Sequence, residues 1–174
     1  MIDPIFVVEP TFVEWTSQML EKNTLTVYVD KSMKPMKDFT KELVKATDWM
    51  LDIKFKFVKK EKKADIRFYQ QDVIDSDPYV VGVAEYCSSY WNIKINRFTI
   101  NEAKPWVILH EFGHTLGLEH PFDAYDGDYY QTLDPWGDTS ATTNDTVMAY
   151  NVVRPFPTIW TATDYDALTG TWNK

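Results

Sequence analysis

All three histidines of the chain lie within eleven consecutive residues, in the order H-E-x-x-H-x-x-G-x-x-H. On a helix, His110 and His114 are four residues apart and project from one face, so both imidazoles can reach one metal ion. Gly117 lets the chain leave the helix through a left-handed or tight turn, after which His120 can return as a third ligand. The spacing therefore predicts a helix with two ligands and a turn that supplies the third.

An acidic residue follows the first of these histidines directly. Glu111 lies beside the predicted metal without needing to bind it, where its carboxylate can act as general base on a metal-activated water. The motif fixes five positions with scarce residue types, so its chance occurrence in one domain is on the order of one in a hundred thousand. Three neutral imidazoles with an open fourth position are typical of catalytic zinc. We therefore predict one catalytic zinc ion held by His110, His114 and His120.

Composition narrows the class of protein. A length of 174 residues fits one domain, and 44% hydrophobic residues are too many for a disordered chain. The aromatic share of 16% predicts a heavily packed core, an aromatic binding surface, or both. A net charge of −8 argues against a nucleic-acid partner, because phosphates would not be neutralised. The one basic cluster, residues 59–63, is interpreted as a solvated hairpin tip.

The single cysteine and the N-terminal sequence bear on the compartment. Cys87 has no partner for an intramolecular disulfide, and we interpret it as a small buried hydrophobic residue rather than a zinc ligand. We find no secretory signal and no apolar stretch of membrane-spanning length, so we expect no membrane association. The protein would then be secreted by a non-classical route, released by lysis, or carried in a larger particle such as a virion.

Hydrophobic spacing predicts an α+β fold. Residues 1–23 are interpreted as an irregular N-terminal arm with a short helix around residues 15–20. Alternation predicts strands, and helical spacing predicts helices. The expected strands are 25–30, 53–57, 66–68, 79–85 and 91–96, and the expected helices are 35–50, 102–116 and 164–169. Gly82, inside a strand, predicts a bulge or the close approach of another backbone.

Between His110 and Tyr150 the chain resembles the catalytic domain of the metzincin zinc peptidases, most closely the serralysin and matrix-metalloproteinase group. Residues 146–150, T-V-M-A-Y, resemble the Met-turn, which places a methionine, here Met148, beneath the metal. Tyr150 matches the tyrosine that serralysins and astacins use as a movable zinc ligand and transition-state donor. The resemblance implies catalytic roles for Glu111 and Tyr150.

The same resemblance implies a fold and a domain organisation. The expected fold is a twisted, mixed five-stranded sheet with an edge strand over the cleft, two long helices, and a loop-rich C-terminal part that ends in a short helix. Residues 24–174 would form one catalytic domain, with an upper subdomain at 24–117 and a lower one at 118–174. The glycine-aspartate repeats and the propeptide of some metzincins are missing from the sequence. We therefore expect another restraint on activity, such as an inhibitor or a larger assembly.

The predicted function is that of a zinc-dependent endopeptidase. Its protein or peptide substrate would bind as an extended strand along residues 80–85. Residues 151–160 would form a wall of the specificity pocket, lined by Phe156 and Trp160. The sequence does not reveal which peptide bonds are cut.

Two alternatives remain open. Five aspartates after His120 could bind calcium, although a solvated acidic loop is the interpretation we prefer because their order is not that of an EF-hand. They are Asp123, Asp126, Asp128, Asp134 and Asp138. The chain could instead be a structural or binding component of a larger assembly that retains the metal but has little proteolytic activity, or a protease with one narrow target. The intact Glu111 favours an enzyme.

Overall fold

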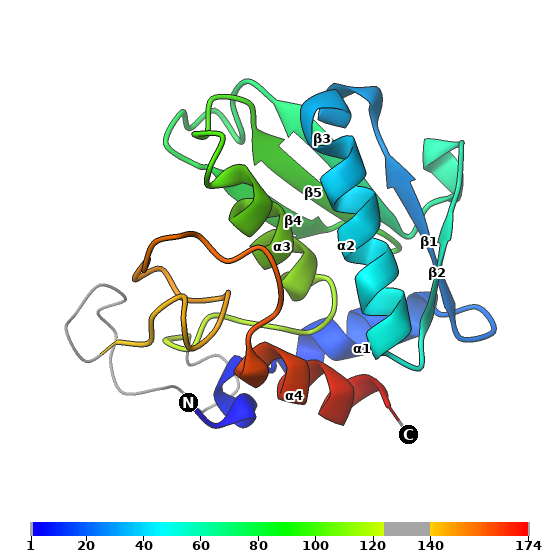
Figure 1. Cartoon of the computed structure of the whole chain (residues 1–174). Helices are drawn as coiled ribbons and strands as arrows, with labels where there is room; N and C mark the ends of the chain where they lie inside the picture. The colour runs from blue at the N-terminus through cyan, green and yellow to red at the C-terminus, as the bar shows by residue number, and fades with distance from the viewer. Residues whose placement is uncertain (1, 124–139, 174) are drawn as a thin grey trace.

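We describe a computed structural model of the chain at residues 2–123 and 140–173 (Figure 1). Within these residues a five-stranded sheet has the strand order β2-β1-β3-β5-β4. The strands are β1 Thr24–Val29, β2 Lys54–Phe57, β3 Ile66–Gln71, β4 Gly82–Tyr86 and β5 Trp91–Asn96. Four of them are parallel, whereas β4 lies at one edge and is antiparallel to β5. The predicted mixed sheet with an edge strand is confirmed.

Two helices, α2 (Lys37–Met50) and α3 (Lys104–His114), cover the same face of the sheet. In β3 and β5 the buried side chains alternate with half-buried ones, so that every second residue faces the core. Helices α2 and α3 pack on that buried face (Figure 1). Phe112 of α3 reaches across the interface, with its ring 5.7 Å from that of Phe68. This packing fixes the helix that carries two histidines against the sheet.

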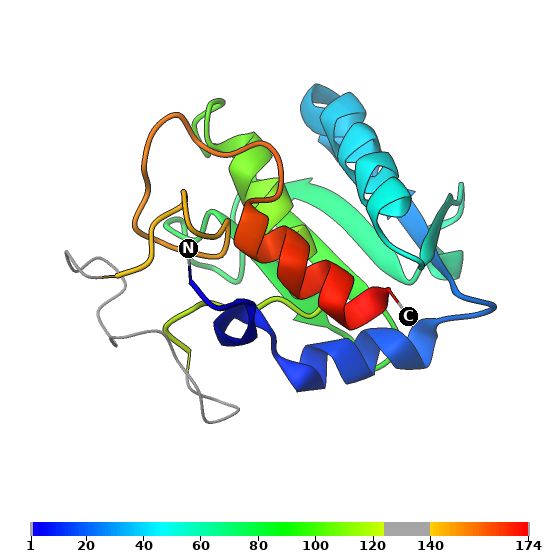
Figure 2. The same ribbon diagram turned by 60° about the horizontal axis from the view of Figure 1, so that its bottom comes forward.

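The N-terminal arm is more regular than the sequence predicts. It contains a short 3-10 helix, η1 (Pro4–Val7), and a ten-residue helix, α1 (Pro10–Met19). Proline is favourable at the first position of a helix, and the Glu9 side chain caps the first turn, so Pro10 starts α1 rather than interrupting it. Helix α1 runs beside the C-terminal helix α4 (Ala162–Trp172; Figure 2). The arm thus packs against the body of the protein.

The basic cluster at residues 59–63 is not a hairpin tip. Strands β2 and β3 both pair with β1, one on each side, so they are not neighbours. The connection between them crosses the end of β1 and contains the 3-10 helix η3 (Glu61–Lys63). The hairpin prediction was wrong because local alternation does not reveal which strand comes between two others. The lysines of the cluster are exposed, as expected.

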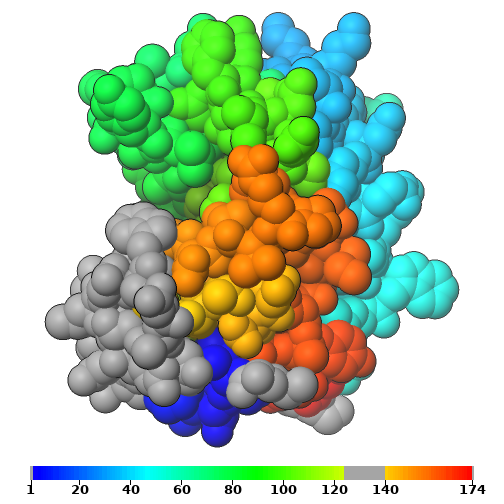
Figure 3. Space-filling model, turned by 60° about the vertical axis from the view of Figure 1, so that its left-hand side comes forward, coloured from blue at the N-terminus to red at the C-terminus, as the bar shows by residue number. Residues whose placement is uncertain are grey.

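The C-terminal part lies below the sheet, and in Figure 3 its yellow and orange residues lie beneath the green residues of the upper half. Helix α4 is longer than predicted and starts with a capping box of Thr161 and Asp164. A further 3-10 helix, η2 (Lys31–Met36), contains Pro35 and precedes α2. No described helix is both long and apolar enough to cross a bilayer. The division of the chain at residues 23 and 117 stays a prediction.

Candidate metal centre

The three histidines of the sequence motif meet at one point. His110 and His114 lie on successive turns of α3, which ends at His114. Gly117 then adopts φ of +99°, and this left-handed residue lets the chain turn back towards the helix. His120 follows, with its Nε2 atom 3.1 Å from Nε2 of His110. One ring nitrogen from each histidine lies within 4.8 Å of the other two, so the three could hold a metal ion.

The outer nitrogen of each ring is held by an oxygen atom. Nδ1 of His110 lies 2.9 Å from the carbonyl oxygen of Val147, and Nδ1 of His114 lies 2.8 Å from that of Leu118. Carbonyl oxygens only accept, so both Nδ1 atoms must carry the ring proton. Nδ1 of His120 lies 2.8 Å from Oδ2 of Asp123.

The inner Nε2 atoms therefore present lone pairs to one another. Lone pairs facing each other across such short distances call for a cation between them, and the oxygen partners behind the rings fix ring orientation as they do in metal sites. The donor set fits a transition metal.

Burial keeps the two helix histidines neutral. Loss of solvent and the nearby His120 together lower the pKa of His110 to about 3, although the hydrogen bond to Val147 acts to raise it. The pKa of His114 is lowered well below its usual value for the same two reasons. Both imidazoles are thus unprotonated at neutral pH, as metal ligands must be.

Glu111 is buried between α3 and the edge strand. Burial raises the pKa of its carboxyl to about 8, while the backbone N–H of Ala84 acts to lower it. Its Oε1 would lie 2.7 Å from a Cβ atom at Gly82, and Val107 would be closer still. Gly82 therefore makes room for helix side chains. The sequence predicted a bulge or an approaching backbone there, and the structure instead places side chains against the glycine.

The residues that resemble a Met-turn lie directly below α3. Met148 is fully buried, and its Sδ atom would lie 2.9 Å from a Cβ atom at Gly113. The side chain of Asp164 on α4 accepts hydrogen bonds from Thr146 Oγ1 at 2.5 Å and from the Val147 N–H at 3.0 Å. The turn is thereby anchored to α4, and it presents the Val147 carbonyl to His110.

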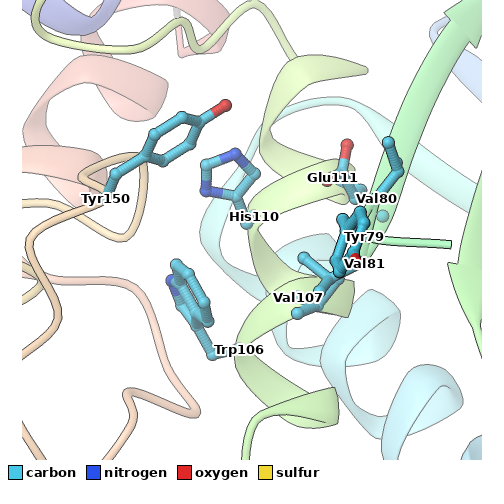
Figure 4. A pocket seen from close by; sticks show the side chains of 9 residues that line it. Tyr79, Val80, Val81, Trp106, Val107, His110, Glu111 and Tyr150 are labelled. Atoms are coloured by element: carbon cyan, nitrogen blue, oxygen red, sulfur yellow. The ribbon is translucent and has the colours of Figure 1, made fainter. Parts of the chain in front are cut away.

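Tyr150 follows the turn and lies against the histidines. Its ring centroid is 4.7 Å from that of His120 and 5.8 Å from that of His110. Figure 4 shows Tyr150 and Trp106 on either side of His110, with Glu111 beyond it. Burial raises the pKa of Tyr150 to about 12, so its phenol keeps its proton at neutral pH. A neutral phenol here can donate a hydrogen bond.

Two cavities open on either side of these residues, and both are bordered by Gly82, His110, Glu111 and Tyr150. One has a volume of about 400 Å³, and its other lining residues are Tyr79, Val80, Val81, Trp106 and Val107. The second has a volume of about 480 Å³ and is lined in addition by His114 and His120, by Phe12 and Trp15 of α1, by Val83, Ala84 and Tyr86 of β4, and by Trp91, Phe122 and Asp123. Because they share these four residues, the two cavities adjoin beside β4 and the residues that precede it, and we call them together the cleft.

Phe156 and Trp160, the two residues expected to line the specificity pocket, lie at different places relative to the cavities. Phe156 stacks on Trp106, which lines the smaller cavity, with ring centroids 5.6 Å apart. Trp160 is outside both cavities: its Nε1 donates to Thr47 Oγ1 at 3.1 Å, so it packs between α3 and α2. That prediction was wrong because position in a loop does not tell which side of α3 a side chain reaches.

Sequence reasoning missed the aromatic residues that line the cleft. Trp106 precedes His110 by one helical turn, which was the available signal, and its Nε1 donates to the Val147 carbonyl at 2.9 Å. Phe12 and Trp15 were assigned to the arm. Cys87 is half-buried rather than buried, and its Sγ lies 3.5 Å from Nδ2 of Asn92.

Of the five aspartates that calcium could bind as the alternative to a solvated loop, Asp123 lies in the described residues, and its Oδ2 atom is 2.8 Å from Nδ1 of His120. The other four aspartates, Asp126, Asp128, Asp134 and Asp138, lie outside the described residues. Among the residues that the structure describes, the three histidines form the only group of metal-ligating side chains close enough to share an ion.

Comparisons with known proteins identify the fold. No family model matches the chain, and no curated protein matches it. Its fold is similar to that of two solved structures of myroilysin, each with a TM-score of 0.57. The first is 14% identical and covers 87% of this chain and 93% of its own. The second is 16% identical and covers 91% of this chain and 87% of its own. The chain has a metzincin-like fold.

Proposed function

We propose that the protein is a zinc-dependent endopeptidase of metzincin type in which Glu111 is the general base. The observation that carries this proposal is the convergence of three imidazoles whose outer nitrogens are all held by oxygen atoms. A structural zinc site normally closes its fourth position with a protein ligand, whereas catalytic sites have three protein ligands and an open position. The three-histidine group at the centre of a cleft fits the second kind.

The bound zinc would lower the pKa of a water molecule and polarise a carbonyl oxygen. The side chains around it have separate roles in the proposal. Glu111 accepts the proton of the attacking water and passes it to the leaving amine. Tyr150, which keeps its proton, donates a hydrogen bond to the oxygen of the cleaved carbonyl group.

The substrate in this proposal is an extended polypeptide. Strand β4 borders both cavities, and within the described residues it pairs with β5 on one side only, so its other edge can bind a further strand. Backbone hydrogen bonds along an edge bind any extended chain, and the cavities on either side select side chains. This arrangement supports the prediction of substrate binding along residues 80–85.

The resemblance to metzincins supports the zinc and the peptidase chemistry. The solved structures with a similar fold are myroilysins, and they do not support placement in the serralysin and matrix-metalloproteinase group. We therefore propose a metzincin without that subgroup assignment.

The test is chelator-sensitive cleavage of an unfolded protein. The purified zinc-loaded chain should cut it at internal bonds, lose the activity when a chelator strips the metal, and regain it when zinc is added back. His114→Ala should be inactive throughout. Bound zinc without cleavage of any unfolded substrate would instead indicate a metal-retaining binding or structural component. A chain that binds no zinc would contradict the proposal.

A further inference from the structure

Aromatic side chains from three elements meet at one end of the cleft. Trp15 of α1 stacks on Tyr86 at the end of β4, with ring centroids 4.6 Å apart and an interplanar angle of 6°. Trp91 at the start of β5 lies 5.2 Å from Tyr86 and 5.8 Å from Phe12 of α1. We call these four residues, Phe12, Trp15, Tyr86 and Trp91, the aromatic wall. They join the N-terminal helix to the edge of the sheet.

The aromatic wall is continuous with the metal centre. The ring of Phe12 lies edge-on to that of His114, at 5.9 Å and 89°. All four wall residues line the larger cavity, which also contains Glu111 and the three histidines. A side chain that fills this cavity therefore belongs to a residue close to the bond that is cut.

Helix α1 is held in place by buried hydrogen bonds. Thr16 Oγ1 donates to the carbonyl oxygen of Thr115 at 2.7 Å and accepts from Trp91 Nε1 at 3.0 Å. The N–H of Glu9 donates to the carbonyl oxygen of Gly117 at 2.9 Å. Val13 packs directly against Gly117, in the space that a Cβ atom would occupy. The wall is thus preformed, and α1 is attached to the turn that brings back His120.

The lining favours an apolar occupant. Among the described residues that line the larger cavity there is no lysine or arginine, and the carboxyl groups are those of Glu111 and Asp123, so an acidic side chain is disfavoured. Within the described residues, the indole N–H groups of Trp91, Trp106, Trp160 and Trp172 all donate to protein atoms. The half-buried Trp15 donates to no group there. One face of its ring stacks on Tyr86, and Trp15 also lines the larger cavity, where a ligand can contact the rest of the side chain.

We infer that α1 is a wall of the substrate cleft, where it forms with β4 and β5 a subsite for a large apolar or aromatic side chain of the peptide. This inference rests on the proposed peptidase function. Antiparallel pairing is the commoner arrangement of neighbouring strands. In a peptide that pairs in this way with β4, the residues opposite Tyr86 lie N-terminal to the scissile bond. The subsite therefore selects the residue on that side.

The test compares cleavage of peptides that differ at one position N-terminal to the scissile bond. The wild type should prefer Phe, Tyr, Leu or Met over Ala or Gly. Trp15→Ala should lower kcat/KM by about tenfold or more for the large apolar peptides, and by less than about twofold for the Ala and Gly peptides. Trp49→Ala is the matched control, because Trp49 lies on α2 and is 90% exposed. It should leave every rate unchanged.

Two further variants distinguish a loss of side-chain selectivity from a general loss of folding. Trp15→Phe keeps an aromatic ring and should retain most of the selectivity. Should Trp15→Ala fail to fold or to bind zinc, Tyr86→Ala replaces it in the same comparison. An unchanged ratio of rates between large and small side chains in a folded, zinc-loaded wall variant would overturn the inference.

A binding measurement distinguishes this inference from the proposed function. Peptides that carry Phe or Gly at the selected position are titrated into the zinc-loaded Glu111→Gln chain, with and without Trp15→Ala. The wild type could cleave no peptide while the Phe peptide still binds more tightly than the Gly peptide and Trp15→Ala removes this difference. In that case the peptidase proposal fails and the subsite stands. Equal binding of both peptides would refute the subsite even if the protein is a peptidase.

Discussion

The carbonyl oxygen of Val147 accepts hydrogen bonds from two side chains of α3, Trp106 Nε1 and His110 Nδ1, both at 2.9 Å. A carbonyl oxygen has two lone pairs, so both bonds can form at once. This one atom fixes the tautomer and the ring plane of His110, and it fixes Trp106 at the mouth of the smaller cavity. At the scale of residues, a proposed metal ligand and a residue that lines the smaller cavity are therefore positioned by the same group.

At Gly82 there is no room for a side chain beside Glu111. A methyl group in Gly82→Ala would lie 2.7 Å from Glu111 Oε1 and would displace the carboxyl group. Because small displacements of a catalytic group cost about a hundredfold, we expect kcat/KM to fall by about ten- to a hundredfold at unchanged zinc affinity. Gly170→Ala on α4 is the control, since no atom lies within 4 Å of its Cβ position. Full activity of Gly82→Ala would contradict the account.

The buried histidines make the stability of the metal-free protein depend on pH. The pKa of His110 is lowered to about 3, whereas the unfolded chain binds this proton near pH 6.5. The free energy of unfolding is therefore independent of this group above pH 6.5, and it falls by about 1.4 kcal/mol per pH unit as the pH decreases from 6.5 towards 3, because only the unfolded chain binds the proton there. Urea unfolding of the chelated protein at several pH values measures this slope.

The control for this measurement is His110→Gln, which keeps Glu111. A control is needed because Glu111 changes the pH dependence of stability in the opposite direction to His110. Its raised pKa makes the folded state lose stability as the pH rises from about 4.5 to 8. The difference between the wild type and His110→Gln cancels that contribution. Equal slopes in the two proteins below pH 6.5 would contradict the burial of a neutral His110.

At the scale of elements, Asp164 links α4 to the turn below the metal centre. Its carboxyl group accepts from the N–H groups of Thr161 and Val147, at 2.9 and 3.0 Å, and so caps the helix and holds the turn. Asp164→Ala removes the cap and leaves buried donors unpaired. We expect the free energy of unfolding to fall by about 3 kcal/mol and zinc to bind roughly tenfold more weakly.

The matched variant is Asp166→Ala, because Asp166 is exposed on the same helix. It should change stability by less than about 0.5 kcal/mol and leave zinc affinity intact. Chemical denaturation and zinc titration measure both quantities. Similar losses in the two variants would show that the effect comes from α4 alone and not from its link to the turn.

The elements differ in how far the sequence predicts them. Alternation located β1 and β5 because each buries one face, and the histidine motif located α3. Two errors have a common physical cause. The start of α1 at Pro10 and the position of β1 between β2 and β3 depend on partners distant in the sequence, which local patterns do not show. The aromatic residues of the cleft were missed because aromatic spacing on a helix is the same in a core and in a binding site.

At the scale of the whole molecule, the three proposed metal ligands come from α3 and the turn that follows it, and that turn is packed against α1. Because only the folded chain assembles this site, zinc should stabilise it by mass action, by about 4 kcal/mol at a thousandfold excess over Kd. For a chain of this size we expect a rise in Tm of roughly 8–16 °C. Calorimetry with zinc and with chelator measures this difference. His114→Ala should abolish it, and an equal Tm of the wild type in both solutions would contradict metal binding.

The central claim is that a buried carboxyl group beside three metal-binding imidazoles performs peptide hydrolysis. Its most direct test is the rate of peptide cleavage by the wild type and by Glu111→Gln at equal, measured zinc occupancy. Glutamine keeps the size of the side chain but cannot accept the proton, so we expect the same zinc content and Tm and a fall in kcat of about a hundredfold or more. Equal rates in the two proteins, or no cleavage by the fully loaded wild type, would contradict the account.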